Sequence, residues 1–306
     1  MKHALDRRSL LAAAGASAAA IALGAPALAR APSAARTLKK AVGIGMVGEG
    51  DTLLDKFLIV RDCGFQGLEL DSPSELKHED VLAAQEKSGV RVHGLVDSKH
   101  WSHPLNSFDK EVRAESIAAL ETALRDAKLY GSTSVLLVPA VVNAKLPYAE
   151  AWKRSQDAIR RVLPLARELG VRIAVENVWN QFLESPLEAA RYVDEFQDPS
   201  LAFHFDIGNV VNYGWPEQWI AILGPRIVKL HVKDYSRKKR DDEGLWKGFD
   251  VELGQGDANY AAVMPALDAV GYSTAPQGNW ATAEVNGGDR KRLKQISDQM
   301  DHLFSL

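Results

Sequence analysis

The stretch VRIAVENVWN (residues 171–180) joins a short apolar segment to a carboxylate and an amide, Glu176 and Asn177. The segment 171–175 has the length and composition of a buried strand. A helical pattern at 149–170 precedes it, and a second one at 186–196 follows. A strand between two helices indicates parallel pairing, because parallel strands need a crossover connection that is usually a helix.

This strand–helix unit repeats along the chain. Strand patterns occur at 41–47, 67–70, 90–96, 134–140, 171–177, 201–209, 227–234 and 279–285. The helical patterns that follow them occur at 51–64, 79–89, 111–131, 149–170, 186–196, 216–224, 259–271 and 289–304. Eight units in about 270 residues predict a single closed (β/α)8 barrel. A doubly wound open sheet is the alternative, but it usually has fewer strands, and no glycine-rich phosphate turn follows the first strand.

The first 30 residues, MKHALDRRSLLAAAGASAAAIALGAPALAR, differ from the rest of the chain. Arg7 and Arg8 precede a weakly apolar, Ala-rich run that closes with a small-x-small pattern at 27–29. This predicts a twin-arginine export signal over 1–29, cleaved after about Ala29, and hence a periplasmic protein that meets the twin-arginine export machinery. We expect a linker at 30–39 and the barrel at 40–306. An uncleaved anchor is the alternative, but the run is too Ala-rich and Gly-broken for stable membrane insertion.

Charge and cysteine content narrow the classes of partner. Cleavage after Ala29 removes three of 37 basic residues and one of 40 acidic ones, which leaves a formal charge of −5. A nucleic-acid partner is therefore not expected, because its phosphates need a basic face. Cys63 is the single cysteine, so an exported protein must be stable without an internal disulfide. The oligomeric state stays open, including a homo-oligomer.

Polar residues end the last four predicted strands. In a (β/α)8 barrel these strand ends meet at the mouth, where active sites lie, and strand parity allows all four side chains to point inward. The residues are Glu176, Asp206, His231 and Glu284. Each alone is more typical of a helix cap, a loop ion pair or a core histidine. Together, three carboxylates would repel one another unless they share a cation, and oxygen ligands with one imidazole favour Mn²⁺, with Mg²⁺, Co²⁺ or Zn²⁺ as alternatives.

Several motifs resemble a known family over roughly residues 40–300. They are VENVWNQFLESP, FHFDIGNVVNYGWPEQWI, KLHVKDY, ELGQGDANYAAVMPALDAVGY and ATAEV. These resemble the xylose isomerase-like TIM barrels, the sugar phosphate isomerase/epimerase group that is distantly related to endonuclease IV. The resemblance implies the barrel, the same four metal ligands, and an arginine six residues after the histidine ligand that holds substrate oxygens, here Arg237.

Two positions depart from the ketose 3-epimerases of that group. Those enzymes carry a second Glu six residues after the first Glu ligand, where this chain has Phe182. They also carry a His three residues after the Asp ligand, where this chain has Asn209, which we keep as a substrate-binding candidate. The resemblance therefore implies the metal centre but not the same substrate.

Other polar residues are candidates for the mouth. Lys233 shares a strand face with His231 and could stabilise an enolate oxygen, although a surface lysine is the alternative. His100 and Trp101, in a polar loop at 97–107, could contact substrate. Glu69 ends a strand and could line the mouth or cap the next helix. We also expect Asn177 and Asn180 to orient Glu176. The segment LGQGDANY (253–260) should form a structural turn with Asp257 near a helix N-cap. The basic segment SRKKR (236–240) should be a solvated loop.

Three functions fit these residues. The first is a metal-dependent isomerase or epimerase of a small sugar or keto sugar, working through an enediolate with Glu176 and Glu284 as proton-transfer groups. The second is a lyase or hydratase acting on a 3-keto sugar or keto glycoside through the same enolate, which the export signal favours. The third is a non-catalytic sugar-binding protein or an endonuclease relative. The intact ligand set argues against the former and the few strand-end histidines against the latter.

Overall fold

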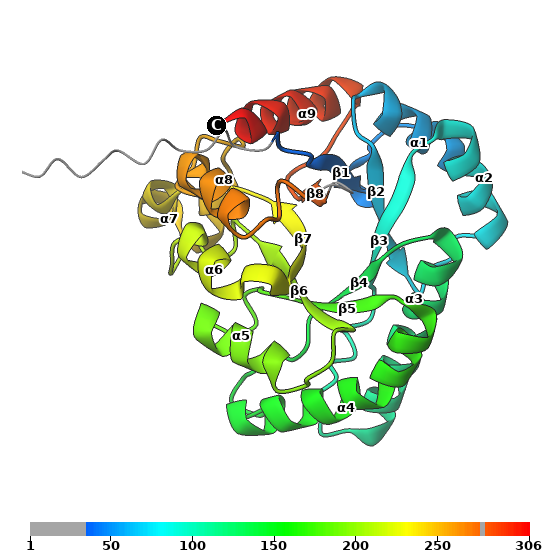
Figure 1. Ribbon diagram of the computed structural model, residues 1–306, viewed down its shortest axis with the longest axis vertical. Helices are drawn as coiled ribbons and strands as arrows, with labels where there is room; N and C mark the ends of the chain where they lie inside the picture. Colours follow the sequence, from blue (N-terminus) through cyan, green and yellow to red (C-terminus); the bar gives the residue numbers. More distant parts are fainter. Residues whose placement is uncertain (1–34, 276–278) are drawn as a thin grey trace, which may run out of the picture. The chain divides into compact units, whose positions relative to one another are not determined.

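The computed structural model describes residues 35–275 and 279–306 (Figure 1). Eight parallel strands pair in chain order, and β8 pairs with β1 to close the barrel. The predicted (β/α)8 barrel is therefore confirmed. The predicted export signal and the linker residues 30–34 lie outside the described residues. Residues 36–39 were expected in the linker, but β1 begins at Lys39 and the Arg36 guanidinium binds Asp268 and the Phe304 carbonyl.

The strands of the barrel are β1 (Lys39–Gly43), β2 (Gly67–Ser72), β3 (Arg91–Asp97), β4 (Ser134–Leu137), β5 (Arg172–Glu176), β6 (Leu201–Asp206), β7 (Ile227–Val232) and β8 (Trp280–Ala283). The helices are α1 (Leu53–Asp62), α2 (His78–Ser88), α3 (Lys110–Tyr130), α4 (Tyr148–Leu169), α5 (Pro186–Asp194), α6 (Pro216–Leu223), α7 (Arg237–Glu243), α8 (Tyr260–Ala269) and α9 (Arg290–Ser305). Short 3₁₀ helices are η1 (Ile44–Met46), η2 (Gly224–Arg226) and η3 (Leu245–Phe249).

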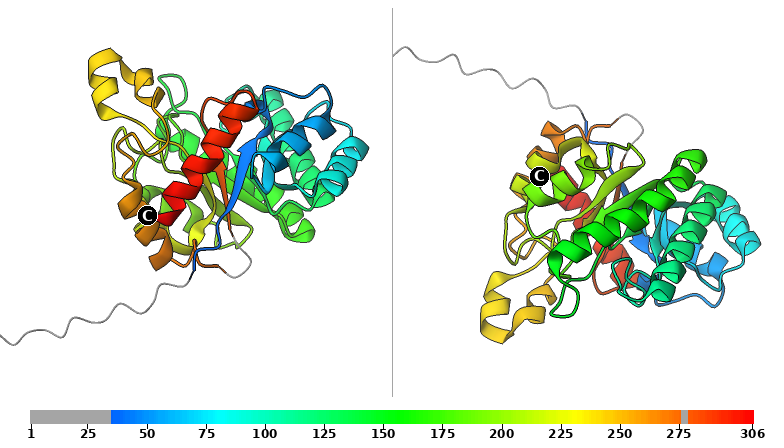
Figure 2. Two further views of the ribbon diagram at one scale, coloured as in Figure 1. Left: turned by 90° about the horizontal axis from the view of Figure 1, so that it is seen from above. Right: turned by 90° about the horizontal axis from the view of Figure 1, so that it is seen from below.

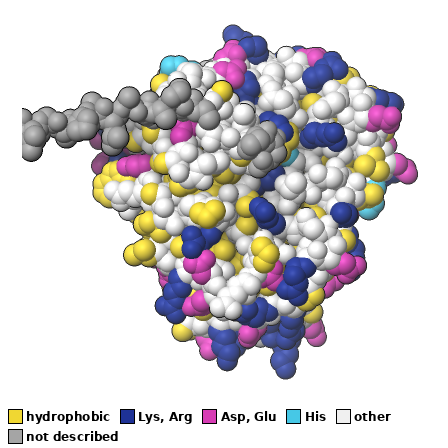
Figure 3. Space-filling view, in the orientation of Figure 1, with side chains coloured by type: hydrophobic (Ala, Val, Ile, Leu, Met, Phe, Trp, Pro, Cys, Tyr) yellow, Lys and Arg dark blue, Asp and Glu magenta, His cyan; other side chains and the backbone are white. Residues whose placement is uncertain are grey.

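The helices other than α7 surround the barrel and bury apolar side chains against it. In α4, for example, residues such as Ala158, Ile159, Val162 and Ala166 are buried, while Glu150 and Arg154 pair on the outer side. Acidic and basic side chains are interspersed on the surface (Figure 3). Within the described ranges, no helix combines the length and the apolar character that crossing a membrane requires.

The loop after β7 contains two elements that the sequence patterns did not predict. We expected the basic segment 236–240 to be a solvated loop, but it begins α7, and η3 follows. Ser236 caps α7 by accepting a hydrogen bond from the Lys239 backbone N–H, and i,i+4 ion pairs support it. Helix α7 has no buried residue, so no apolar periodicity could indicate it. It stands out from the barrel in Figure 2.

The turn at 253–260 is folded around the carboxylate of Asp234. Oδ2 accepts from the N–H groups of Gly254 and Gly256, both at 2.9 Å, and Oδ1 accepts from those of Tyr235 and Ala258. A Cβ at Gly256 would lie 2.2 Å from Oδ1, so this position has no room for a side chain. The structural interpretation of this turn is confirmed.

Asp257 lies near a helix N-cap, as expected, two residues before that of α8. Asn259 is the N-cap residue of α8, while the Asp257 carboxylate accepts the backbone N–H of Arg237. The carboxylate therefore joins the turn to the start of α7, because that N–H is one of the groups at a helix N-terminus that lack a partner within the helix.

Asp234→Ala should destabilise the barrel, because it leaves four backbone donors without their acceptor. We expect a loss on the order of 3 kcal/mol in the free energy of unfolding, and a fall in Tm of roughly 6–12 °C. Asp250→Ala is the control, since this carboxylate pairs with Lys247 at the surface and its loss should leave Tm nearly unchanged. Equal Tm values for the two variants would contradict this role of Asp234.

Candidate metal centre

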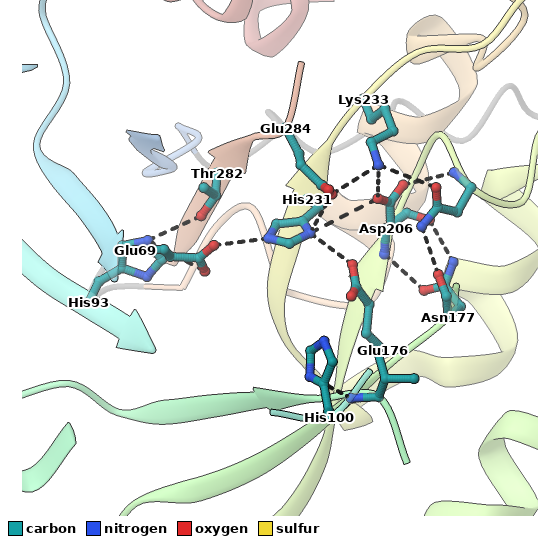
Figure 4. Close-up of polar contacts among 12 residues, drawn as sticks. Glu69, His93, His100, Glu176, Asn177, Asp206, His231, Lys233, Thr282 and Glu284 are labelled. Atoms are coloured by element: carbon teal, nitrogen blue, oxygen red, sulfur yellow. Dashed lines mark hydrogen bonds and ion pairs between the residues drawn. The ribbon is translucent and has the colours of Figure 1, made fainter. Parts of the chain in front are cut away.

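The four predicted metal ligands meet at the C-terminal end of the barrel. Glu176 and Asp206 are the last residues of β5 and β6, His231 is in β7, and Glu284 follows β8 directly. One ligand atom from each lies within 4.8 Å of the others (Figure 4). Parity along four neighbouring parallel strands thus brings together residues that are up to 108 positions apart in the sequence.

The imidazole of His231 lies at the centre of this cluster. Its Nδ1 is 2.8 Å from Glu176 Oε1, 2.9 Å from Glu284 Oε2 and 4.0 Å from Asp206 Oδ2. Its Nε2 is 2.9 Å from Glu69 Oε2. Burial lowers the pKa of His231, but the charges of Glu284, Glu69 and Glu176 outweigh it and raise the pKa well above its ordinary value. The surrounding carboxylates therefore favour the protonated form of the ring.

Burial and neighbouring charges also shift the pKa values of the three carboxylates. Burial raises the pKa of Glu176, although His231 opposes this, and burial raises that of Asp206 to about 7 against the charge of Lys233. Glu284 is 46% exposed. Burial raises its pKa too, but His231 and Lys233 lower it well below the ordinary value. The buried carboxylates Glu176 and Asp206 therefore favour their neutral forms unless a further cation stabilises their charges.

The arrangement fits a divalent cation. Asp206 Oδ2 is buried, and among the described residues its contact is an ion pair without hydrogen-bond geometry. The Lys233 ammonium lies 3.2 Å from this oxygen and 3.0 Å from Glu284 Oε2. Three carboxylates and one imidazole suit Mn²⁺, Mg²⁺, Co²⁺ or Zn²⁺. This cluster could hold a metal ion.

Amides hold the end of β6 in place. Asn177 donates to the Asp206 carbonyl at 2.8 Å and accepts from the Asp206 N–H at 2.9 Å. Asn209 donates from its backbone to Asp206 Oδ1 and from its side chain to the Asn177 carbonyl. Asn180 binds the Ala140 carbonyl. The expectation that Asn177 and Asn180 orient Glu176 was wrong, because both amides reach backbone groups of neighbouring segments instead.

A cavity of about 300 Å³ adjoins the cluster and is lined by Glu176, His231 and Glu284 together with the predicted residues His100, Trp101 and Glu69. His100 is buried, and burial lowers its pKa to about 4, so the ring is neutral. Its Nδ1 accepts from the Val138 N–H at 3.3 Å, which leaves the ring proton on Nε2. Trp101 is 54% exposed and packs edge-on against His100.

The other substrate candidates lie in different surroundings. Glu69 does not cap α2, whose N-cap residue is Lys77, but binds His231 as described above. Arg237 donates to the Val211 and Gly214 carbonyls and lies over the ring of Trp215, so its described contacts are not with the cluster. Lys233 reaches the cluster, as parity predicted, and its ammonium also contacts Asn209 Oδ1 at 3.4 Å. Roles for these residues in binding substrate stay predictions.

A second group of polar side chains lies inside the barrel beneath the cluster, and we did not predict it. Its members are His93, His204, Lys229 and Thr282, all at most 3% exposed. Three of them stand two residues before a predicted ligand, so the same parity could have found them. His93 could not be found in this way, because the register between β2 and β3 shifts at Leu68/Glu69.

The amino-acid sequence is similar to those of proteins named as sugar phosphate epimerases. L-ribulose-5-phosphate 3-epimerase UlaE of Escherichia coli O1:K1 / APEC is 26% identical over 235 residues, which cover 73% of this chain and 80% of the relative. The protein of the same name from Salmonella typhi is 24% identical over the same length, with the same coverage.

Solved structures share the fold. A structure of L-ribulose 3-epimerase has a TM-score of 0.70 and 16% identity, and covers 88% of this chain and 95% of the other. The structure of 3-keto-D-glucoside 4-epimerase YcjR from E. coli has a TM-score of 0.71, also with 16% identity, and covers 88% and 100%. Residues 57–306 match the family described as xylose isomerase-like TIM barrel. The chain therefore belongs to the xylose isomerase-like TIM barrel family.

Proposed function

We propose that the protein is a divalent-metal-dependent sugar isomerase or epimerase that works through an enediolate, with Mn²⁺ as the favoured ion. The observation that supports this most is the pair Glu176 and Glu284. They approach His231 Nδ1 from β5 and from the end of β8, at 2.8 and 2.9 Å, and both line the cavity. The epimerase relatives support a reaction on a sugar.

The proposed mechanism uses two carboxylates. One removes a proton from the substrate, and the other returns a proton to it. The chemistry that a bound divalent ion supplies is polarisation of the substrate's carbonyl and neighbouring hydroxyl oxygens. Glu176 removes the proton from the carbon beside the carbonyl, and the electron pair of that C–H bond passes into the enediolate. Glu284, protonated from water at the mouth of the barrel, then donates its proton to the enediolate from the opposite side, which yields the epimer or the isomer, and Glu176 releases the abstracted proton to water.

Two other residues assist by hydrogen bonding and charge. His100 is neutral and carries its proton on Nε2, so it is suited to donate a hydrogen bond to a substrate oxygen in the cavity it lines. Lys233 lies 3.0 Å from Glu284 Oε2 and favours its charged form. The lysine would thus stabilise the carboxylate that remains after Glu284 has given its proton to the enediolate.

A lyase or hydratase acting on a 3-keto sugar or keto glycoside is the second candidate. In this case the electron pair of the enolate expels the oxygen substituent on the β-carbon, and the leaving oxygen takes a proton. One observation favours it: Phe182 is 1% exposed and packs against Tyr148, Trp152 and Tyr192. The position where ketose 3-epimerases carry a substrate-reading Glu therefore belongs here to an aromatic core.

Glu176→Gln tests the proton-transfer role. The variant keeps the side-chain volume and one coordinating oxygen but loses the basic oxygen, so turnover should fall by a factor on the order of 10² or more. The measurement is deuterium incorporation from D₂O beside the carbonyl of 3-keto, free and phosphorylated sugars, read by NMR at equal Mn²⁺ occupancy. Loss of a glycosidic group instead of exchange would favour the lyase. Exchange at the parent rate would make Glu176 a ligand only.

Asp206→Ala tests the metal ligand set. It should abolish Mn²⁺ binding in calorimetry and leave the far-UV circular dichroism of the barrel unchanged, because the ligands lie at the mouth and not in the main core. Asp97→Asn is the matched control, since Asp97 is also buried at a strand end but bonds only within its own loop among the described contacts. Parent-like Mn²⁺ affinity in Asp206→Ala, or equal loss in both variants, would refute the assignment.

We also propose that the chain is exported by the twin-arginine route and acts in the periplasm, on the basis of Arg7 and Arg8 in DRRSLL. The combined Arg7→Lys and Arg8→Lys variant should remain in the cytoplasm with its N-terminus uncleaved. Cell fractionation and N-terminal sequencing would measure this. Normal export and cleavage of the double variant would show that the arginine pair is not read as this signal.

A further inference from the structure

The barrel interior directly beneath the candidate metal centre is polar, where such barrels usually hold branched apolar side chains. Six side chains there are at most 5% exposed: Glu69, His93, His204, Lys229, His231 and Thr282. Burying each polar group is costly unless it is hydrogen-bonded. Packing alone therefore does not explain why the side chains in this layer are polar.

Hydrogen bonds join Lys229, His93 and Thr282 into one column, and a separate contact joins Glu69 to His231. Figure 4 shows the His93–Thr282 and Glu69–His231 contacts. The Lys229 amine donates to the His93 carbonyl at 2.8 Å and lies 3.1 Å from His93 Nδ1. With Nδ1 accepting from the amine, the His93 proton is on Nε2, which lies 3.1 Å from Thr282 Oγ1 and 3.8 Å from Glu69 Oε1. The Trp280 ring stacks on the His93 ring, with the two ring centroids 4.6 Å apart.

The separate contact is between Glu69 and His231. Glu69 Oε2 lies 2.9 Å from His231 Nε2, on the side of the ring that faces away from the three other carboxylates. A neutral imidazole carries one proton, and an acceptor on Nε2 favours the tautomer whose Nδ1 lone pair is free. A carboxylate on the far nitrogen of a histidine ligand also fixes the plane of the ring and increases its basicity.

We propose that Glu69 is the positioning residue of the metal centre: it holds the Nε2 proton of His231 so that Nδ1 points at the ion. The column of His93, Thr282 and Lys229 lies beside the Glu69 carboxylate, with His93 Nε2 at 3.8 Å from Oε1. This inference rests on the proposed function, because it assigns a partner to a proposed metal ligand. It differs from the substrate contact or helix cap that strand position alone suggested for Glu69.

Other neighbours of His231 do not provide this bond. The His204 ring packs against His231 at 4.1 Å and 60°, but its Nε2 has no hydrogen-bond partner among the described residues. His204 therefore contributes shape and not an acceptor. Glu69 supplies the one acceptor described on Nε2, and it comes from β2, on the opposite side of the barrel from the ligands of β5 and β6.

The test compares Glu69→Gln and Glu69→Leu with the parent and with Asp97→Asn, in the full chain. Mn²⁺ dissociation constants are measured by calorimetry, and Tm is measured without metal. Glu69→Gln keeps a neutral acceptor and should weaken Mn²⁺ binding about tenfold, while Glu69→Leu should weaken it about 100-fold. Asp97→Asn should bind as the parent does. With Mg²⁺ bound, long-range ¹H–¹⁵N NMR of the parent should show the His231 proton on Nε2.

The outcomes separate this inference from the proposed function. If the parent does not bind Mn²⁺, the proposed metal centre fails. If the parent binds it and both Glu69 variants bind equally well, the centre stands and the positioning role is overturned. If Glu69→Leu does not fold, Glu69→Gln decides: parent-like affinity overturns the role, and so does an increase in KM at unchanged affinity, which would indicate a substrate contact.

Discussion

The contact on which the site depends is the imidazole of His231 held between two sets of carboxylates. Nδ1 faces Glu176 and Glu284, and Nε2 faces Glu69, each within 2.9 Å. One ring therefore connects the mouth of the barrel to its polar interior. Any rotation of the ring would break bonds on both sides, so the position of this ligand is determined before an ion or substrate arrives.

The two halves of the barrel contribute different parts of the site. The strands β5 to β8 supply the charged cluster and Lys233, on rigid backbone whose end is clamped by Asn177. The first half supplies walls of the cavity, from η1, the end of β2 and the loop after β3 that carries His100 and Trp101. In the proposed site, the second half of the barrel would hold the ion and the first half would enclose the substrate. This division suits a (β/α)8 barrel, because its loops vary in sequence while its strand ends keep their positions.

Much of this arrangement could be predicted because it follows from short-range periodicity. Alternation of strand and helix patterns predicted the barrel, and parity predicted that Glu176, Asp206, His231 and Glu284 meet. The bond from Glu69 to His231 could not be predicted, since it joins residues 162 positions apart and depends on barrel closure and on an irregular register. Arg237 shows the converse: its spacing suggested a substrate contact, but helix α7 turns its guanidinium toward backbone carbonyls.

The most direct test of the account is the location of the ion itself. Crystals of the Mn²⁺-loaded protein would be measured at the manganese absorption edge, and an anomalous difference map calculated. The account predicts a single strong peak within coordination distance of Glu176, Asp206, Glu284 and His231 Nδ1, at about 2.0–2.3 Å. A peak on the other side of the ring, between Glu69, His204 and His231 Nε2, or no peak near His231 in a protein that binds Mn²⁺, would contradict it.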